Sequence, residues 1–450
     1  MWWKDAKLYE LYIDKYAGNL KGLTAKLDYF TKLGVNTLHI LPHYPSPMVD
    51  DGYDVSDYRG VRPELGTLDD FKTLLAEARK RNIRIITDFV LNHTSREHPW
   101  FLEARSSRTN PKRDWYLWSK TGSEFAESMN PFPDMKPNNW IYSSDTDDYY
   151  FATFYPGQPD LNWDNPDVFE AVLSAMEFWA ELGVSGFRLD AAPYLIKRDG
   201  TECRGLPETH DVLKRMRARL EKKYPDVILL AEAAHPIEEV LPYFGNGDEC
   251  HMAYNFPLMG EMWMELMRRS KNPTKGKDSV LSSGNPNSLL QDFSDRLRKF
   301  AEASEKIPAN CQWATFLRNH DEIELITLPE EDREPLRAWL DPHKQYPFRK
   351  GETTAMRIAS IFRGDTEKIL QALKLLYTMP GAPVMYYGDE LGMENVHNIA
   401  FILDTRRHVR GEFDWALAER QMADPQSLWS KVATLIKDRS THSPDAILAK

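Results

Sequence analysis

The sequence predicts an α/β protein folded as a (β/α)8 TIM barrel. Two observations support this fold class: short apolar runs typical of buried strands recur along the chain, and amphipathic helical patterns separate most of them. The eight expected strands are Leu8–Ile13, Thr37–Leu41, Ile83–Val90, Gly186–Leu189, Val227–Leu230, Cys250–Asn255, Trp313–Leu317 and Pro383–Tyr387. The helical patterns include Gly22–Leu33, Thr67–Arg81, Asp167–Leu182, Glu208–Lys223 and Glu367–Thr378.

Two long intervals interrupt this alternation and predict the domain organisation. Residues 94–165 follow the third strand and are rich in Pro, Asn, Ser, Asp, Trp and Tyr, with little periodicity. Such insertions are usually functional or disordered, and the aromatic content favours an ordered lid or cleft wall. A second, charged insertion is expected at about residues 322–361. The barrel would then consist of residues 1–93 and 166–450, and little chain remains for a further domain after the helical pattern Leu428–Lys437.

The composition limits the classes of function. The 42% hydrophobic and 28% charged residues are typical of a globular protein, and the net charge of -11 argues against a nucleic-acid partner. No apolar run is long enough to span a membrane, and the first residues do not resemble a signal peptide. Three widely spaced cysteines, Cys203, Cys250 and Cys311, fit free thiols in a reducing compartment. We therefore expect a cytoplasmic protein with no membrane partner.

A charged pair closes the fourth expected strand, where Arg188 and Asp190 follow the buried positions Gly186 and Phe187. Buried charges are costly unless they are paired, and the carboxyl ends of barrel strands open onto the active site. Asp190 is therefore a candidate nucleophile that Arg188 would keep ionised. Taken alone, the pair is equally consistent with a structural ion pair at a strand end.

Polar groups also follow three other strands, and a further group lies in a loop. They are Asp88 to His93 after the third strand, Glu232 after the fifth, Asn319, His320 and Asp321 after the seventh, and Asp50 to Asp54 before the third. An isolated histidine or aspartate is often structural, for example as a helix cap. Their joint occurrence on four strands of one predicted barrel instead favours a common site at its mouth.

Paired carboxylates in such a site indicate glycoside hydrolysis or transfer. A retaining enzyme needs a carboxylate nucleophile and a protonated carboxylic acid near the glycosidic oxygen. Asp190 fits the nucleophile, while Glu232 follows an apolar run in which desolvation would raise its pKa, as an acid/base requires. Asp321 and the two histidines, His93 and His320, could bind sugar hydroxyls and stabilise positive charge.

With these residues in place, the chain resembles glycoside hydrolase family 13, the α-amylase superfamily. The resemblance covers essentially the whole chain and rests on motifs at Asp88–His93, Gly186–Asp190, Glu232, His320–Asp321 and Gln158–Asn162. It implies that residues 94–165 form domain B and that Asp190, Glu232 and Asp321 act as nucleophile, acid/base and transition-state stabiliser. It also implies that Arg188, His93 and His320 line the glucose subsite, that Tyr53 stacks on the sugar ring, and that no cofactor is needed.

Two subfamilies compete within this resemblance. The middle of the chain is similar to trehalose synthases, in residues 50–54, 206–210, 247–254 and 311–314, whereas the ends are similar to amylosucrases, in residues 12–23, 404–410 and 414–415. The amylosucrase pattern implies a salt bridge between Asp50 and Arg406 that seals the pocket behind one glucose; the alternative is two independent surface charges. Arg406→Ala should then damage turnover far more than folding.

Several departures from these patterns qualify the resemblance. The Pro-Met-Gln-Trp motif of trehalose synthases is absent, and Tyr16, Ala17 and Gly18 replace the metal-binding loop of oligo-1,6-glucosidase relatives, so no metal is expected. The β-sandwich that ends most relatives is also expected to be missing or very short. Barrel surface exposed in this way would favour a partner chain or a homo-oligomer.

The resulting expectation is an α-retaining glucosidase or transglucosylase acting on a small disaccharide. Trehalose synthase-like interconversion of maltose and trehalose, with some hydrolysis, is favoured over an amylosucrase-like, sucrose-cleaving activity. A catalytically dead binding subunit is disfavoured because all three catalytic carboxylates are present. An open-cleft endo-acting amylase is disfavoured by the Gln158–Asn162 motif and by the expected Asp50–Arg406 seal.

Overall fold

The computed structural model describes residues 1–271, 293–304, 306–397, 399 and 403–439. Its centre is a closed barrel of eight parallel strands in the order β1-β13-β10-β9-β8-β7-β3-β2. These strands are β1 (Leu8–Leu11), β2 (Thr37–Ile40), β3 (Arg84–Val90), β7 (Gly186–Asp190), β8 (Ile228–Ala231), β9 (Met252–Tyr254), β10 (Gln312–Phe316) and β13 (Ala382–Tyr386). Each of the eight predicted strands is present, so the predicted fold class is confirmed.

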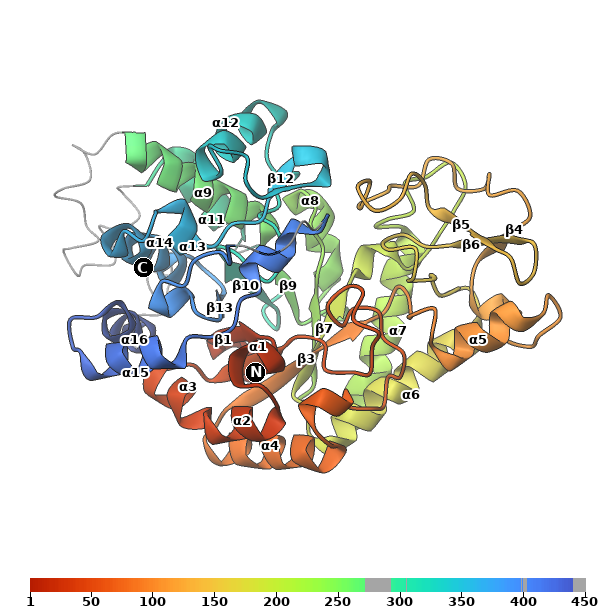
Figure 1. Ribbon diagram of the computed structural model, residues 1–450, viewed down its shortest axis with the longest axis horizontal. Helices are drawn as coiled ribbons and strands as arrows, with labels where there is room; N and C mark the ends of the chain where they lie inside the picture. The colour runs from red at the N-terminus through yellow and green to blue at the C-terminus, as the bar shows by residue number, and fades with distance from the viewer. Residues whose placement is uncertain (272–292, 305, 398, 400–402, 440–450) are drawn as a thin grey trace.

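Helices surround the barrel and cover the outer faces of its strands (Figure 1). The described α-helices outside the first insertion are α1 (Ile13–Ala17), α2 (Leu20–Ala25), α3 (Leu27–Leu33), α4 (Leu68–Lys80), α6 (Pro166–Leu182), α7 (Pro207–Lys223), α8 (Ile237–Val240), α9 (Phe256–Lys271), α11 (Asp295–Ser304), α12 (Glu330–Leu340), α13 (Ile358–Ile361), α14 (Thr366–Thr378), α15 (Trp415–Ala423) and α16 (Leu428–Asp438). Of these, α12 and α13 belong to the second insertion. One predicted helix, Gly22–Leu33, is instead two helices, because Lys26 ends α2 with a non-helical backbone conformation and precedes α3.

Local sequence signals explain where the long helices begin and end. Thr67 and Asp70 form a capping box at the start of α4. Asn165 caps α6, whose first residue is Pro166, and Gly183 ends it in a left-handed conformation that glycine adopts without strain. Gly183 thus ends α6 shortly before β7 begins at Gly186.

The first insertion forms a separate lobe beside the barrel, next to β3 and α6 (Figure 1). It contains α5 (Pro99–Ser106) and an antiparallel sheet of β4 (Trp118–Ser119), β6 (Asp148–Phe151) and β5 (Trp140–Ser143). Its aromatic side chains pack on one another: the rings of Phe101 and Trp118 are stacked with centroids 5.6 Å apart. The insertion is therefore ordered, as its aromatic content predicts.

The second insertion, between β10 and α14, contains α12, α13 and a hairpin of β11 (Pro347–Phe348) and β12 (Thr353–Thr354). Phe348 of this hairpin packs against Phe132 of the first insertion, with ring centroids 5.5 Å apart. The two insertions thus meet above the barrel and form the walls around its mouth.

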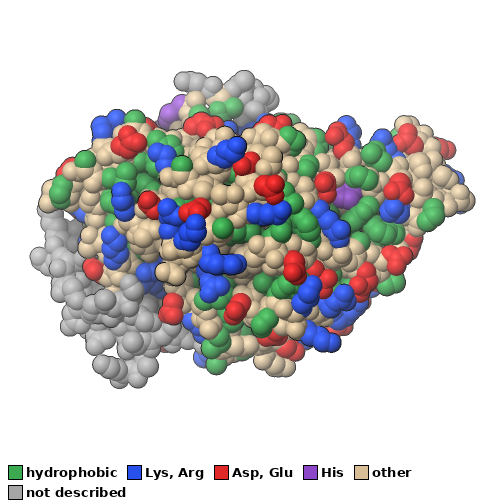
Figure 2. Space-filling view, turned by 90° about the horizontal axis from the view of Figure 1, so that it is seen from below, with side chains coloured by type: hydrophobic (Ala, Val, Ile, Leu, Met, Phe, Trp, Pro, Cys, Tyr) green, Lys and Arg blue, Asp and Glu red, His purple; other side chains and the backbone are tan. Residues whose placement is uncertain are grey.

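After β13 the described chain forms α15 and α16, which lie against the barrel, and no β-sandwich occurs among the described residues up to 439. Residues 440–450, assigned above to the barrel, lie outside the described part. None of the described helices combines the length and the apolar character needed to cross a bilayer. On the described part of the face in Figure 2, basic and acidic side chains lie interspersed with hydrophobic ones.

Candidate active site

A cavity opens at the carboxyl ends of the barrel strands, beneath the two insertions. Its volume is about 870 Å³ when the open mouth is included. Seven of the nine predicted site residues line it: Asp50, Tyr53, His93, Asp190, Glu232, Asp321 and Arg406. The other two, Arg188 and His320, are buried behind the wall and contact its carboxylates.

Arg188 is the centre of the carboxylate cluster. Its guanidinium contacts Asp88 and Asp190, each at 2.6 Å, and also forms an ion pair with Glu232. The barrel register explains this, because β3 and β7 pair Asp88 with Arg188, and β7 and β8 pair Leu189 with Ala231. Parallel pairing therefore places Asp190 and Glu232 at adjacent strand ends, both within reach of one guanidinium.

The sequence predicts Asp190 beside Arg188 and Glu232 in apolar surroundings, but in the structure both carboxylates share the Arg188 guanidinium. Burial raises the pKa of Asp190 well above its usual range; Arg188 lowers it, while Glu232 and Asp88 raise it further. Glu232 lies in polar rather than apolar surroundings, because it also accepts a hydrogen bond of 3.0 Å from the Ala191 backbone N–H. One guanidinium cannot neutralise three carboxylates, so a fully ionised cluster would carry excess negative charge.

Asp321 is held by three cationic side chains. The contacts are 3.0 Å from His320 Nε2, 3.1 Å from Arg406 Nη1 and 2.8 Å from Arg410 Nη2. Although burial opposes it, this positive charge holds the pKa of Asp321 well below its usual range. Burial lowers the pKa of His320, but Asp321 and Glu10 outweigh burial and raise it to about 9. These contacts therefore keep Asp321 ionised.

Two buried residues that sequence reasoning missed connect these clusters. Glu10 contacts His320 at 2.8 Å, and His39 lies between Glu10 at 3.3 Å and Asp88 at 3.0 Å. Both side chains are fully buried in the barrel interior. The available signal was a charged or titratable residue in the middle of an apolar strand, since Glu10 lies in β1 and His39 in β2.

Asp50 and Arg406 form an ion pair at one end of the cavity, with Asp50 Oδ1 3.0 Å from Arg406 Nη2. Both side chains are at least nine-tenths buried, so the alternative of two independent surface charges is wrong. Arg406 also contacts Asp404 at 2.6 Å, and Gln158 Nε2 donates to Asp50 Oδ2 at 3.0 Å. The guanidinium lies over the rings of Phe132 and Phe348, 4.8 and 4.9 Å from their centroids.

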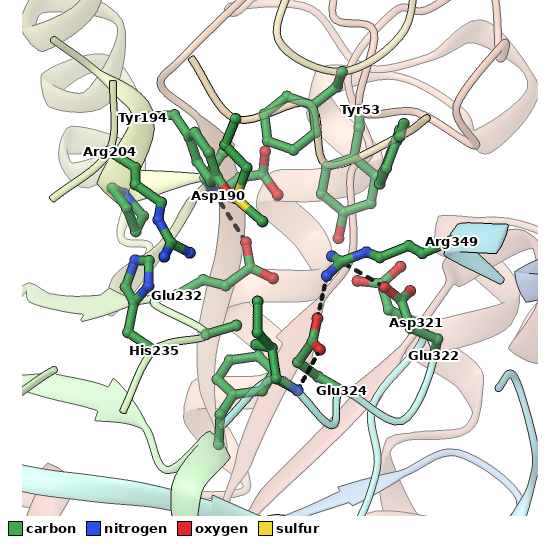
Figure 3. A pocket seen from close by; sticks show the side chains of 18 of the residues that line it. Tyr53, Asp190, Tyr194, Arg204, Glu232, His235, Asp321, Glu322, Glu324 and Arg349 are labelled. Atoms are coloured by element: carbon green, nitrogen blue, oxygen red, sulfur yellow. Dashed lines mark hydrogen bonds and ion pairs between the residues drawn. The ribbon is translucent and has the colours of Figure 1, made fainter. Parts of the chain in front are cut away.

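The other part of the cavity is lined by further residues. Of these, the sequence predicts Ala234 and His235, which follow Glu232, at the border of the leaving-group site, but not the others. Figure 3 shows Arg204 and His235 on one side and Arg349, Glu322 and Glu324 on the opposite side, with Glu232 between them. Tyr194 and Phe256 contribute aromatic surface. Within the described ranges, no group of three or more His, Cys, Asp or Glu side chains is arranged to hold a metal ion.

Comparison with known proteins identifies the family. The model of the α-amylase catalytic domain matches residues 6–342, so the chain belongs to the α-amylase family, glycoside hydrolase family 13. Among curated relatives, the trehalose synthase of Thermus thermophilus is 42% identical over 424 residues, which are 92% of this chain and 41% of that protein. The trehalose synthase/amylase of Mycolicibacterium smegmatis is 40% identical over 92% of this chain and 67% of its own length. The chain thus spans about two fifths to two thirds of these relatives.

Solved structures share the fold over nearly the whole chain. An α-glucosyl transfer enzyme superposes with a TM-score of 0.74 and 25% identity over 98% of this chain and 84% of its own. A trehalulose synthase mutant in complex with Tris gives a TM-score of 0.73 and 27% identity over the same shares. The expected resemblance to family 13, with trehalose synthases among its relatives, is confirmed.

Proposed function

We propose that this chain is an α-retaining transglucosylase that interconverts maltose and trehalose, with some hydrolysis. The observation that carries the proposal is a cavity with three candidate catalytic carboxylates and one end closed by the buried Asp50–Arg406 ion pair. A closed end admits one terminal glucose unit rather than the interior of a long chain. The similarity to two trehalose synthases at 40–42% identity supports the same reaction.

In this mechanism, Asp190 attacks the anomeric carbon while Glu232 donates a proton to the glycosidic oxygen. The bond from that carbon to oxygen 4 of the second glucose breaks, and a covalent glucosyl-enzyme forms. The freed glucose then turns within the cavity. Its 1-hydroxyl attacks the same carbon, transfers its proton to Glu232 and displaces Asp190, which gives the α,α-1,1 linkage.

The surrounding residues support each step of this reaction. The excess of carboxylates around Arg188 favours retention of one proton among them. In the proposed mechanism, Glu232 carries this proton when substrate binds. Asp321, held ionised by His320, Arg406 and Arg410, would stabilise the positive charge that develops at the anomeric carbon. Tyr53 would face the glucose ring, and His93 would bind its hydroxyls.

Transfer rather than hydrolysis requires that the second sugar stays in the cavity while water is kept out. The contact of Phe132 with Phe348 joins the two insertions above the mouth and supplies such a barrier. A reducing compartment such as the cytoplasm belongs to the proposal, because all three cysteines are free and buried.

A sucrose-cleaving glucosyl transferase is the second candidate function. It is favoured by the Asp50–Arg406 pair, which matches the amylosucrase pattern, and by the structural similarity to a trehalulose synthase. Incubation with maltose, trehalose and sucrose separately, followed by proton NMR, tests both candidates. Trehalose formed from maltose supports the first, and fructose released from sucrose supports the second. Free glucose alone would refute transfer, and a β-configured first product would refute retention.

A further inference from the structure

We propose that Arg349, together with Glu322, Glu324 and His235, forms the subsite that holds the acceptor sugar, and that Arg349 determines how well that sugar is retained. This inference rests on the proposed function and extends it to the second sugar. Arg349 lies in the hairpin of the second insertion and points into the cavity from the side opposite His235 (Figure 3). Glu232, the proposed acid/base, lies between the two sides.

The contacts of Arg349 hold two carboxylates in fixed positions at the cavity wall. Its guanidinium is 3.1 Å from Glu322 Oε1 and forms a second ion pair with Glu324. Both glutamate side chains are 5% exposed, yet both line the cavity. Such buried carboxylates are strong acceptors for hydroxyl groups, and the planar guanidinium keeps them at a set separation.

Unsatisfied polar atoms mark the same part of the cavity. Neither ring nitrogen of His235 has a hydrogen-bond partner among the described residues, although Nδ1 lies 3.7 Å from Glu239 Oε2. The side chain is 3% exposed and lines the cavity. The buried Nε of Arg349 also lacks a partner there. Buried polar groups normally find partners, so these atoms indicate a ligand with several hydroxyl groups.

The backbone of the hairpin is strained where Arg349 enters the cavity. Arg349 and Lys350 have φ angles of 49° and 53°, a left-handed conformation that is unfavourable for residues other than glycine. The hairpin is held in this position because the Lys350 backbone N–H donates to Asp134 of the first insertion at 2.9 Å. The strain thus places the Arg349 side chain over the cavity, while the first insertion anchors the turn.

The charge balance indicates a neutral acceptor. Arg349 is paired with two glutamates, and Arg204 on the opposite side pairs with Glu202 at 2.7 Å. No unpaired cationic side chain is left among these residues for a phosphate group. The ligand that fits is an uncharged hexose whose adjacent hydroxyls meet the carboxylates, with the aromatic rings of Tyr194 and Phe256 nearby.

The test separates formation of the glucosyl-enzyme from transfer to the acceptor. p-Nitrophenyl α-glucoside serves as donor, and carbon-13-labelled glucose as acceptor, so that NMR distinguishes labelled transfer products from unlabelled glucose released by hydrolysis. In Arg349→Ala, the ratio of transfer to hydrolysis should fall about 10- to 100-fold, and the KM for labelled glucose should rise, because hydrogen bonds involving charged groups are lost. Glucose 6-phosphate should be a poorer acceptor than glucose for the unaltered protein.

Further variants make the test specific. Arg349→Lys should give an intermediate ratio, because it keeps the charge but loses the planar fork. Glu324→Gln should also lower the ratio of transfer to hydrolysis. If Arg349→Ala does not fold, Glu324→Gln and Arg349→Lys together test the proposal. The matched control is Lys350→Ala, which removes the exposed neighbouring cation and leaves its backbone contact with Asp134 in place.

Three outcomes would overturn the subsite: a ratio in Arg349→Ala within twofold of the unaltered protein, an equal loss in Lys350→Ala, or release of p-nitrophenol without any labelled product. The last outcome would leave the retaining glucosidase intact. If maltose gave no trehalose but labelled transfer products still formed and depended on Arg349, the subsite would stand and the proposed reaction would fail. Absence of any p-nitrophenol release would refute the proposed function and, with it, the subsite.

Discussion

Replacement of Arg406 by alanine tests whether the closed end of the cavity is structural, functional or both. Sequence alone predicts a variant that loses turnover but keeps its fold. The contacts revise that expectation, because Arg406 pairs with Asp50, Asp404 and Asp321 and its side chain is only 6% exposed. Removing one partner of a buried pair leaves uncompensated charge and costs about 3–5 kcal/mol.

That cost converts into a measurable change in the midpoint of thermal unfolding. With an unfolding entropy of about 2.1 cal/mol/K per residue, a chain of 450 residues has roughly 0.9 kcal/mol/K. A loss of about 3–5 kcal/mol therefore lowers Tm by about 3–5 °C. Circular dichroism at one fixed heating rate, on both proteins in parallel, measures the shift even if unfolding is irreversible.

Asp50→Asn separates the functional part of this prediction from the structural part. Burial raises the pKa of Asp50 to about 6, so its charge is costly in the folded protein. The neutral asparagine keeps one carbonyl oxygen, which can accept from either Gln158 or Arg406, and Arg406 keeps Asp404 and Asp321 as partners. We expect Tm within about 2 °C of the unaltered protein, and kcat/KM for maltose lower by about 10- to 100-fold through loss of a charged contact to glucose.

Each of these two variants tests a different role of the ion pair, one in turnover and one in stability. Unchanged turnover of maltose by Asp50→Asn would show that the ion pair does not shape the glucose pocket. An unchanged Tm in Arg406→Ala would show that the three carboxylates do not depend on the guanidinium for stability.

Three further predictions concern Glu232, Asp190 and His320. Glu232→Gln should lower kcat/KM for maltose by about 10²–10⁴, with a smaller loss of kcat/KM for p-nitrophenyl α-glucoside, whose leaving group needs no proton; equal losses of kcat/KM would remove Glu232 from the acid/base role. A 5-fluoroglucosyl fluoride should label Asp190, as peptide mass spectrometry would show, and labelling at another carboxylate would replace Asp190 as nucleophile. His320 has a pKa of about 9 in the folded protein and about 6.5 when unfolded, so its contribution of about 3 kcal/mol is complete below pH 6.5 and is lost as pH rises to 9. Urea unfolding at several pH values should show this fall, and His320→Gln should flatten it; an identical slope in the variant would contradict the assignment.

The local pattern of the sequence was sufficient to predict the barrel and the position of the central carboxylates. Apolar runs and caps specify strands and helices through interactions between residues close in sequence, which is why all eight strands were found. Residues directly after a strand must lie at the mouth of a parallel barrel, so Asp190, Glu232 and Asp321 were identifiable before any coordinates.

Only the tertiary structure decided how the charges in the site are shared. Strand register brings Glu232 to the same guanidinium as Asp190, and it places Glu10 and His39 behind the cavity. The folding of the second insertion brings Arg349 to Glu322 and Glu324. These contacts join residues far apart in the chain, and electrostatic energies depend on distance and burial, which periodicity does not encode. The sequence therefore determined where the central carboxylates lie, and the fold determined which other side chains share their charge.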